Sequence, residues 1–265
     1  MIRFFGKTDI GAKRQSNQDT FVCTVLCENA SLGVVCDGMG GCNGGSVASQ
    51  TAVSVFTNYL RLNFVPHIDD DNRLDPSDFS VTELLRSAGA AANEAVFSKS
   101  HEEKELSGMG TTLVAALQID DCVYVANIGD SRLYLITDDE MVQITHDHSF
   151  VQYLVDIGEI TPEEAEVNPN RNVITRAVGS EERTEPDIYF INLAKEGPCR
   201  LLLCSDGLTN YLSTDAIFEI MRRHTPSEGK AEALISAAME GGGGDNITVV
   251  IGDSEEGSAE VTAHE

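Results

Sequence analysis

The chain has 265 residues, of which 42% are hydrophobic and 23% charged, as is typical of a soluble globular protein. Its net charge of −25 argues against nucleic acid and anionic membranes as partners, because both are bound through basic patches. Seven cysteines, an odd count without a Cys-x-x-Cys pair, indicate small buried thiols in a reducing compartment. The run Met1–Gly6 is too short for a signal peptide, and no apolar run approaches a membrane span. We therefore expect a cytoplasmic monomer.

The first part of the chain combines short apolar runs with two helical patterns. Apolar residues at helical spacing predict helices over 45–62 and 80–98. Ser46 is the expected N-cap of the first helix, and Ser80 begins a capping-box pattern for the second. The acidic, turn-rich segment 66–76 between them is expected to be a surface connection. Strands are expected at 3–8, 20–26 and 32–35.

The second part of the chain is richer in strand patterns. Aspartate pairs at 120–121 and 138–139 lie in tight turns and predict hairpins of an antiparallel sheet. The sequence His146-Asp-His148 is expected to cap a helix over 149–157, which an irregular polar segment follows. Strands are expected at 111–117, 122–128, 133–136, 141–144, 173–176, 187–193, 200–204 and from Asp245 onward, and helices at 214–224 and 228–239.

Strands follow strands in this sequence, and helices follow helices. That order favours antiparallel sheets covered by helices, an α+β layered sandwich, over a doubly wound parallel sheet. No repeat or linker is visible, so we expect one domain over 1–253. An acidic, disordered tail is expected over 254–265.

Four aspartates stand where glycine-rich turns meet apolar strands: Asp37, Asp130, Asp206 and Asp245. One Asp-Gly is also an ordinary turn, but the repetition favours a site. If the fold brings these residues together, each pair at ~4 Å repels by roughly 4 kcal/mol at an effective dielectric of 20. Protons or cations must then neutralise the cluster. Oxygen ligands without His or Cys nearby suit Mg²⁺ or Mn²⁺ rather than zinc.

Other residues have plainer interpretations beside their functional ones. Arg14 lies in a polar loop, where a surface arginine is common, but a guanidinium is also a natural fork for a phosphate dianion. His146 and His148 could ligate a metal or move protons, although helix capping explains them more simply. Asn43 stands where a dinucleotide fingerprint needs its third glycine, so that motif fails.

A set of ordered motifs over residues 3–252 resembles the metal-dependent serine/threonine protein phosphatases of the PPM type (protein phosphatase 2C-like), and most closely their compact bacterial members. The motifs are Arg14-x-x-Asn17-Gln-Asp19, Asp37-Gly-Met-Gly-Gly41, Gly108-Met-Gly-Thr-Thr112, Asn127-Ile-Gly-Asp-Ser-Arg132, Thr145-His-Asp-His-Ser149, Ile174-Thr-Arg-Ala-Val-Gly179, Ser205-Asp-Gly-Leu208 and Gly244-Asp-Asn-Ile-Thr248. Each motif alone is weak, but the set is specific.

The resemblance implies an αββα sandwich of two antiparallel sheets with a dinuclear Mn²⁺ or Mg²⁺ centre at one edge. It implies that Asp37 bridges both ions and that Gly38 supplies a backbone carbonyl. Asp206 and Asp245 match ligands of the first ion. Asp130 matches a ligand of a third, weaker ion.

The resemblance also assigns roles around the metals and exposes two departures. Asp19 matches an acid that orients metal-bound water, and Arg14 matches the arginine that binds the substrate phosphate, so the expected catalytic residues are Arg14, Asp19 and Asp37. The segment 157–172 corresponds to a small flap beside the site. Animal members place a histidine, proposed as general acid, where this chain has Met39, so that route of leaving-group protonation is closed. Gln18 replaces a glutamate of some relatives, so any metal contact there is neutral.

The implied reaction is hydrolysis of phosphoserine and phosphothreonine in proteins by a hydroxide that bridges the two ions. The expected partners are phosphoproteins, including a serine/threonine kinase that the enzyme opposes in signalling. Two alternatives stay open from the sequence: a small-molecule phosphoesterase with the same metals, and a catalytically silent binding module that kept the fold. A purely structural acidic protein is the remaining alternative.

Overall fold

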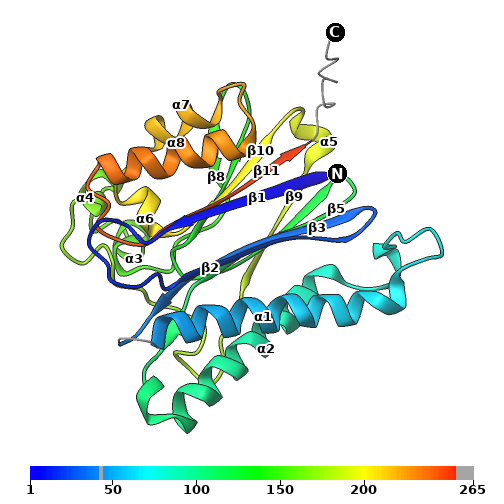
Figure 1. The fold of residues 1–265 in the computed structure, drawn as a ribbon, viewed down its shortest axis with the longest axis horizontal. Helices are drawn as coiled ribbons and strands as arrows, with labels where there is room; N and C mark the ends of the chain where they lie inside the picture. Colours follow the sequence, from blue (N-terminus) through cyan, green and yellow to red (C-terminus); the bar gives the residue numbers. More distant parts are fainter. Residues whose placement is uncertain (42–43, 255–265) are drawn as a thin grey trace, which may run out of the picture.

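The computed structural model describes residues 1–41 and 44–254. Two antiparallel sheets lie face to face, and a pair of helices covers the outer face of each (Figure 1). The αββα sandwich of two antiparallel sheets expected from the sequence is therefore confirmed. None of the helices among the described residues combines the length and apolar character needed to cross a bilayer.

Both sheets mix strands from distant parts of the chain. The five-stranded sheet has the order β1 (Ile2–Asp9), β11 (Ile247–Ser254), β10 (Arg200–Cys204), β7 (Arg132–Ile136) and β8 (Met141–Gln143). The other sheet has the order β2 (Asp19–Cys27), β3 (Ala30–Met39), β5 (Leu113–Ile119), β6 (Cys122–Ile128) and β9 (Asp187–Asn192), and β4 (Gly110–Thr111) pairs with the end of β3. The first and last strands of the described chain are thus neighbours.

The helices form the two outer layers. The long pair α1 (Gly44–Phe64) and α2 (Val81–Glu102) packs on the sheet that contains β3, and α7 (Thr214–Met221) and α8 (Ser227–Glu240) pack on the sheet that contains β11 (Figure 1). Ile217, Ile220 and Met221 form the buried face of α7. The short helices are η1 (Val65–His67), η2 (Pro76–Asp78), η3 (Lys104–Leu106), α3 (Phe150–Asp156), α4 (Pro162–Glu166), α5 (Leu193–Glu196) and α6 (Asp206–Thr209).

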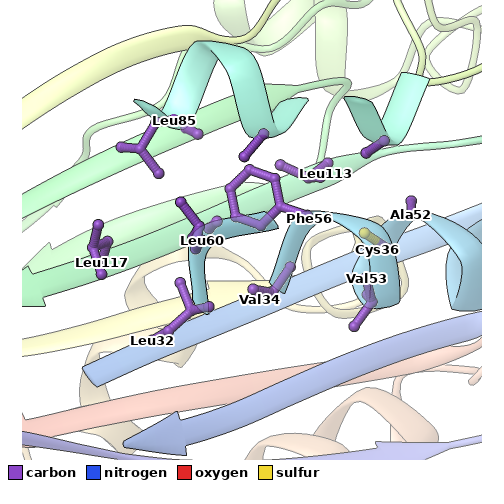
Figure 2. Packing of buried hydrophobic residues seen from close by; sticks show 14 of the residues in the cluster. Leu32, Val34, Cys36, Ala52, Val53, Phe56, Leu60, Leu85, Leu113 and Leu117 are labelled. Carbon is purple, nitrogen blue, oxygen red and sulfur yellow. The ribbon is translucent and has the colours of Figure 1, made fainter. Parts of the chain in front are cut away.

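The sequence of strand β3 is a nearly continuous apolar run, because the strand lies in the middle of the sandwich. Successive side chains of a strand point to opposite faces. Leu32 and Val34 therefore pack toward Phe56 of α1 (Figure 2), while Val35 joins the layer between the two sheets. From Ala30 to Cys36 both faces of β3 are buried, so every position there is apolar or small. Fully burying side chains of this size contributes about 1.5–3 kcal/mol each.

Two predictions at the edge of this strand and helix are wrong. β3 does not stop at Asp37 but continues to Met39, because Gly38 and Met39 pair with β4. Ser46 does not cap α1 but lies within it, since the helix already begins at Gly44. For the second helix, Ser80 is the N-cap as expected, and its side chain accepts a hydrogen bond from the backbone N–H of Glu83 at 3.3 Å.

Two predictions after β8 are also wrong. Ser149, rather than the sequence His146-Asp-His148, caps α3, and its hydroxyl accepts from the backbone N–H of Gln152. The segment 173–176 is not a strand, because Ile174 makes only an isolated bridge with Ser149. A single bridge leaves the segment free to follow the surface rather than a sheet.

The cysteine prediction holds in part. Cys36 and Cys204 are buried, whereas Cys23 and Cys122 are only half-buried. Cys42 lies outside the described residues, as does the expected tail beyond Ser254, at which β11 ends.

Candidate metal centre

Two pairs of strands deliver aspartates to one edge of the sandwich. In the β2–β3 ladder Asp19 lies directly opposite Asp37. In the other sheet β10 leads into α6, whose first residue is Asp206, and Asp245 lies two residues before β11, the neighbour of β10. The register of each ladder therefore fixes where its carboxylates project.

The electrostatics of Asp37 show that these carboxylates face one another. The side chain is half-buried, and the protein packed around it raises its pKa well above the usual range. After burial, the causes are the negative charges of four other aspartates, which are Asp19, Asp206, Asp130 and Asp245 in order of decreasing effect. The structure thus brings the four carboxylates of the glycine-rich turns together with Asp19.

Asp19 is held rigidly beside Asp37. The Thr248 and Ser205 hydroxyls donate to its Oδ2 at 2.7 and 2.8 Å. The pKa of Asp19 is raised to about 6: burial is the largest cause, the two hydroxyls act against it, and the charge of Asp206 adds to the rise. Its other oxygen, Oδ1, is buried without a hydrogen-bond partner among the described residues.

Asp206 resembles Asp19 in that one carboxylate oxygen accepts a hydrogen bond and the other does not. The Asn210 side chain donates to Oδ2 at 2.9 Å, while Oδ1 is buried without a hydrogen-bond partner among the described residues. Burial and the charge of Asp245 raise the pKa of Asp206. Buried polar oxygens are nearly always satisfied, so two orphaned carboxylate oxygens in one cluster fit bound cations.

The donor set decides which cation fits. All candidate side-chain ligands are carboxylates, which suit Mg²⁺ and Mn²⁺. Across residues 1–41 and 44–254, no three Asp, Glu, His or Cys side chains close into a ready-made cage around one ion. Mg²⁺ does not need such a cage, because it keeps several waters and takes only one or two carboxylates. The residues present therefore fit hydrated Mg²⁺ or Mn²⁺ and do not fit a closed zinc site.

Gly38 lies where only glycine can fit. A Cβ on Gly38 would lie 2.0 Å from the carbonyl oxygen of Gly45, and a Cβ on Gly45 would lie 2.6 Å from the carbonyl oxygen of Gly38. The two glycines let the first turn of α1 approach the end of β3. The Gly38 N–H donates to the Gln18 carbonyl at 3.2 Å, so this backbone is fixed beside Asp37.

Asp130 reaches the centre from the loop after β6. Its pKa is raised well above the usual range by burial and then by the charges of Asp206 and Asp147. His148 holds this loop in place: its ring Nδ1 accepts from the Gly129 backbone N–H, and the backbone N–H of His148 donates to the Gly129 carbonyl, both at 3.0 Å. The ring Nε2 lies 3.0 Å from Asp187, so the imidazole is fixed at both nitrogens.

Arg14 lies at the rim of the centre. Its Nη2 lies 2.7 Å from Asp245 Oδ2, while about half of the side chain, 51%, remains exposed. The hydrogen bond to Asp245 raises the pKa of Arg14. The guanidinium is therefore cationic, next to the carboxylates, and open to a ligand from solvent.

The expected flap borders the same region. A cleft of about 560 Å³ is lined by Asp130 and Asp206 on one side and by residues of 162–172, including Val167 and Arg171, on the other. The flap segment thus contains α4 and lies beside the acidic centre.

Several positioning groups were not identified from the sequence. Ser205, Thr248 and Asn246 each contact the predicted residues or their loops, and His148 was assigned to helix capping. Ser205 and Asn246 stand next to predicted aspartates, and this position in the sequence could have identified them as candidates. Thr248 closes the motif Gly244-Asp-Asn-Ile-Thr248, but the motif does not show that its hydroxyl binds Asp19, which is 229 residues away.

Solved structures of serine/threonine phosphatases share this αββα sandwich. The structure of the serine/threonine phosphatase Stp1 from Staphylococcus aureus is similar to this chain with a TM-score of 0.85 and 34% identity, covering 96% of each chain. The catalytic domain of the serine/threonine protein phosphatase PstP in complex with two manganese ions is similar with a TM-score of 0.78 and 36% identity, covering 95% of this chain and 97% of that one.

The sequence comparisons agree with the structural ones. The family model for protein phosphatase 2C matches residues 8–240. The serine/threonine protein phosphatase PstP of Mycobacterium tuberculosis is 39% identical over 253 residues, which cover 96% of this chain. The chain spans 45% of the length of that relative. The chain belongs to the protein phosphatase 2C family.

Proposed function

We propose that this chain is a metal-dependent phosphatase that hydrolyses phosphoserine and phosphothreonine in proteins, and that it opposes a serine/threonine kinase in signalling. The observation that carries the proposal is the acidic centre itself. Five aspartates share one edge of the sandwich, two of their buried oxygens have no hydrogen-bond partner among the described residues, and an exposed arginine stands at the rim. Relatives named as serine/threonine phosphatases support the substrate class.

The resemblance to protein phosphatase 2C assigns the ligands of the metals, and the clustered aspartates support that assignment. Asp37 would bridge two Mn²⁺ or Mg²⁺ ions, with the Gly38 carbonyl, Asp206 and Asp245 as further ligands. Asp130 would bind a third, weaker ion. Bound ions of this kind neutralise charge on the phosphoryl oxygens and lower the pKa of a coordinated water. The two manganese ions of the PstP catalytic domain support this assignment.

The chain's own residues orient the reactants. Asp19, fixed by Ser205 and Thr248, would accept hydrogen bonds from water within the centre and so set its direction. Arg14 would grip two phosphate oxygens with its planar fork. Met39 has no proton to give, so the departing serine oxygen takes its proton from water rather than from this position. Positioning and electrostatics supply most of the acceleration in such reactions.

We also propose a reducing, cytoplasmic location. The six cysteines of the described chain are all free thiols. Free thiols persist where the cell keeps cysteine reduced.

Phosphate release in Mn²⁺ tests the proposal. Phosphoserine and phosphothreonine peptides should be hydrolysed at least tenfold faster, as kcat/KM, than sugar or nucleotide phosphates. Faster hydrolysis of the small phosphates would make the protein a small-molecule phosphoesterase. No release from any substrate, with Mn²⁺ bound, would make it a silent binding module.

A further inference from the structure

The loop between β1 and β2 carries Arg14 and has no regular structure. It spans residues 10–18, and the side chains of 12–16 project into solvent. Arg14 reaches the rim of the centre from the middle of this exposed segment. A guanidinium on a mobile loop would bind phosphate weakly, because ordering the loop would oppose binding.

One buried side chain, that of Asn246, ties together the two ends of this loop at Ile10 and Ser16, which we call its neck. Asn246, only 4% exposed, donates from Nδ2 to the Ile10 carbonyl at 2.8 Å and to the Ser16 carbonyl at 3.1 Å. Its Oδ1 accepts from the Gln18 N–H at 2.8 Å. Two carbonyls need a donor and one N–H needs an acceptor, so the partners fix the orientation of the amide. Both amide hydrogens and the oxygen are therefore used.

The anchored points bracket the arginine. Ile10 and Ser16 lie on either side of Arg14, so a single –NH₂ group ties the two ends of its segment together. A further backbone bond, from the Ala12 N–H to the Gly243 carbonyl at 2.7 Å, fixes only the entry side. On the exit side, among the described residues, Asn246 binds the chain at Ser16, one residue closer to the arginine than the bond from the Asn17 side chain to the Thr8 hydroxyl at 2.8 Å.

We propose that Asn246 is a positioning residue for substrate binding: by closing the neck of the 10–18 loop, it holds the Arg14 guanidinium where the substrate phosphate meets the metal centre. The inference rests on the proposed function, since it deepens the role of Arg14. It assigns to Asn246 no contact with substrate or metal. Misplacing a positioning group by about 1 Å can cost up to about a hundredfold in rate.

The test compares KM and kcat for a phosphoserine peptide in saturating Mn²⁺. Asn246→Ala should raise KM about tenfold and change kcat less than twofold. Arg14→Ala should also raise KM, and the double variant should match Arg14→Ala alone, because without the guanidinium the loop has nothing left to place. An additive double variant would overturn the proposal.

Asn93 offers a matched control on α2. It is 1% exposed and also fastens a loop with three bonds to backbone: its Oδ1 accepts from the Gly179 N–H at 2.7 Å, and its Nδ2 donates to the Glu181 and Glu182 carbonyls at 3.0 and 3.2 Å. Asn93→Ala should lower thermal stability as much as Asn246→Ala while leaving KM unchanged. An equal rise in KM for both would mean that general loosening, not loop placement, is responsible.

Mn²⁺ affinity, measured by calorimetry without substrate, separates Asn246 from its neighbour Asp245. The dissociation constant should change less than twofold in Asn246→Ala. If Mn²⁺ binding weakens and the rise in KM disappears at higher Mn²⁺, Asn246 supports the metal ligand instead and the proposal fails. Should Asn246→Ala not fold, Asn246→Asp gives the same comparison, because it keeps the acceptor for Gln18 and loses both donors.

Binding of inorganic phosphate to the Mg²⁺-loaded protein distinguishes failure of this inference from failure of the proposed function. If the wild type hydrolyses nothing, the function is wrong. Asn246→Ala should still weaken phosphate binding about tenfold, and to the same extent as in the double variant. Unchanged phosphate affinity would overturn the inference by itself.

Discussion

Asp147 and Asp206 line the same cleft, and they belong to two groups of acids that are stabilised in different ways. Asp147, 7% exposed, accepts a hydrogen bond at 2.7 Å from Arg132 Nη2 and another at 2.8 Å from the Gln143 amide, so a protein cation neutralises it. Among the described residues, Arg14 is the cation whose charge interacts with Asp37 and Asp206, and burial and repulsion between the aspartates raise the pKa values of both. Paired acids of the first kind belong to the structure, whereas the unpaired acids of the second kind are the proposed ligands of exchangeable cations.

Removing a charge from the unpaired group should have the largest effect. Asp37→Asn should lower kcat at least about a thousandfold, because the proposed bridging ligand loses its charge while its shape is kept. Phosphate release with a phosphopeptide in saturating Mn²⁺ measures this. Asp139→Asn, at an exposed position, is the control and should be unchanged. Near-full turnover of Asp37→Asn would remove Asp37 from the chemistry.

Removing the cation from the paired group should act on stability instead. Arg132→Met should lower the free energy of unfolding by about 3 kcal/mol, because it leaves Asp147 buried and uncompensated. Urea denaturation measures the loss. Arg222→Met, which breaks the exposed pair with Glu219, should cost less than about 1 kcal/mol. Equal losses in the two variants would contradict the contrast between buried and exposed pairs.

Bound metal should stabilise the folded protein by neutralising the unpaired aspartates, and it should not act on the paired Asp147. Mn²⁺ at about a hundred times its dissociation constant should add about 2.7 kcal/mol to the free energy of unfolding. In EDTA, stability should fall as pH rises from about 4 to about 6, because the pKa of Asp19 is raised to about 6 in the folded state and its proton must be given up. Thermal unfolding across this pH range, with and without Mn²⁺, checks both. A free energy of unfolding that rises with pH in EDTA would contradict the raised pKa of Asp19.

The smallest effect on activity is expected for Arg14, at the rim of the acidic centre. Arg14→Ala should raise KM for a phosphopeptide about tenfold and leave Mn²⁺ affinity within about threefold, because the guanidinium is proposed to bind the substrate phosphate and is bonded to Asp245 through Oδ2. Steady-state kinetics together with calorimetry separate the two. Loss of kcat at unchanged KM would place Arg14 in the chemical step.

The layered fold and the acidic cluster could be predicted because their signals are local. Asp206 and Asp245 stand beside glycines at strand ends, and runs of strand patterns specify antiparallel sheets. What failed depends on distant partners. The extension of β3 past Asp37 needs β4, which is more than seventy residues away. The role of His148 could not be predicted, because it depends on contact with the Gly129 backbone. A run of three polar residues before a helix looks like a cap in the sequence, whatever its side chains contact in the structure.

The neighbouring positions of β1 and β11 have a consequence for folding. Arg14 and Asp245, 231 residues apart, meet only after the first and last strands of the described chain have paired, and Asp37 meets Asp206 only after the two sheets have stacked. Contacts of such long sequence separation form slowly. Activity should therefore appear late during refolding, which makes turnover a stringent reporter of a completed fold.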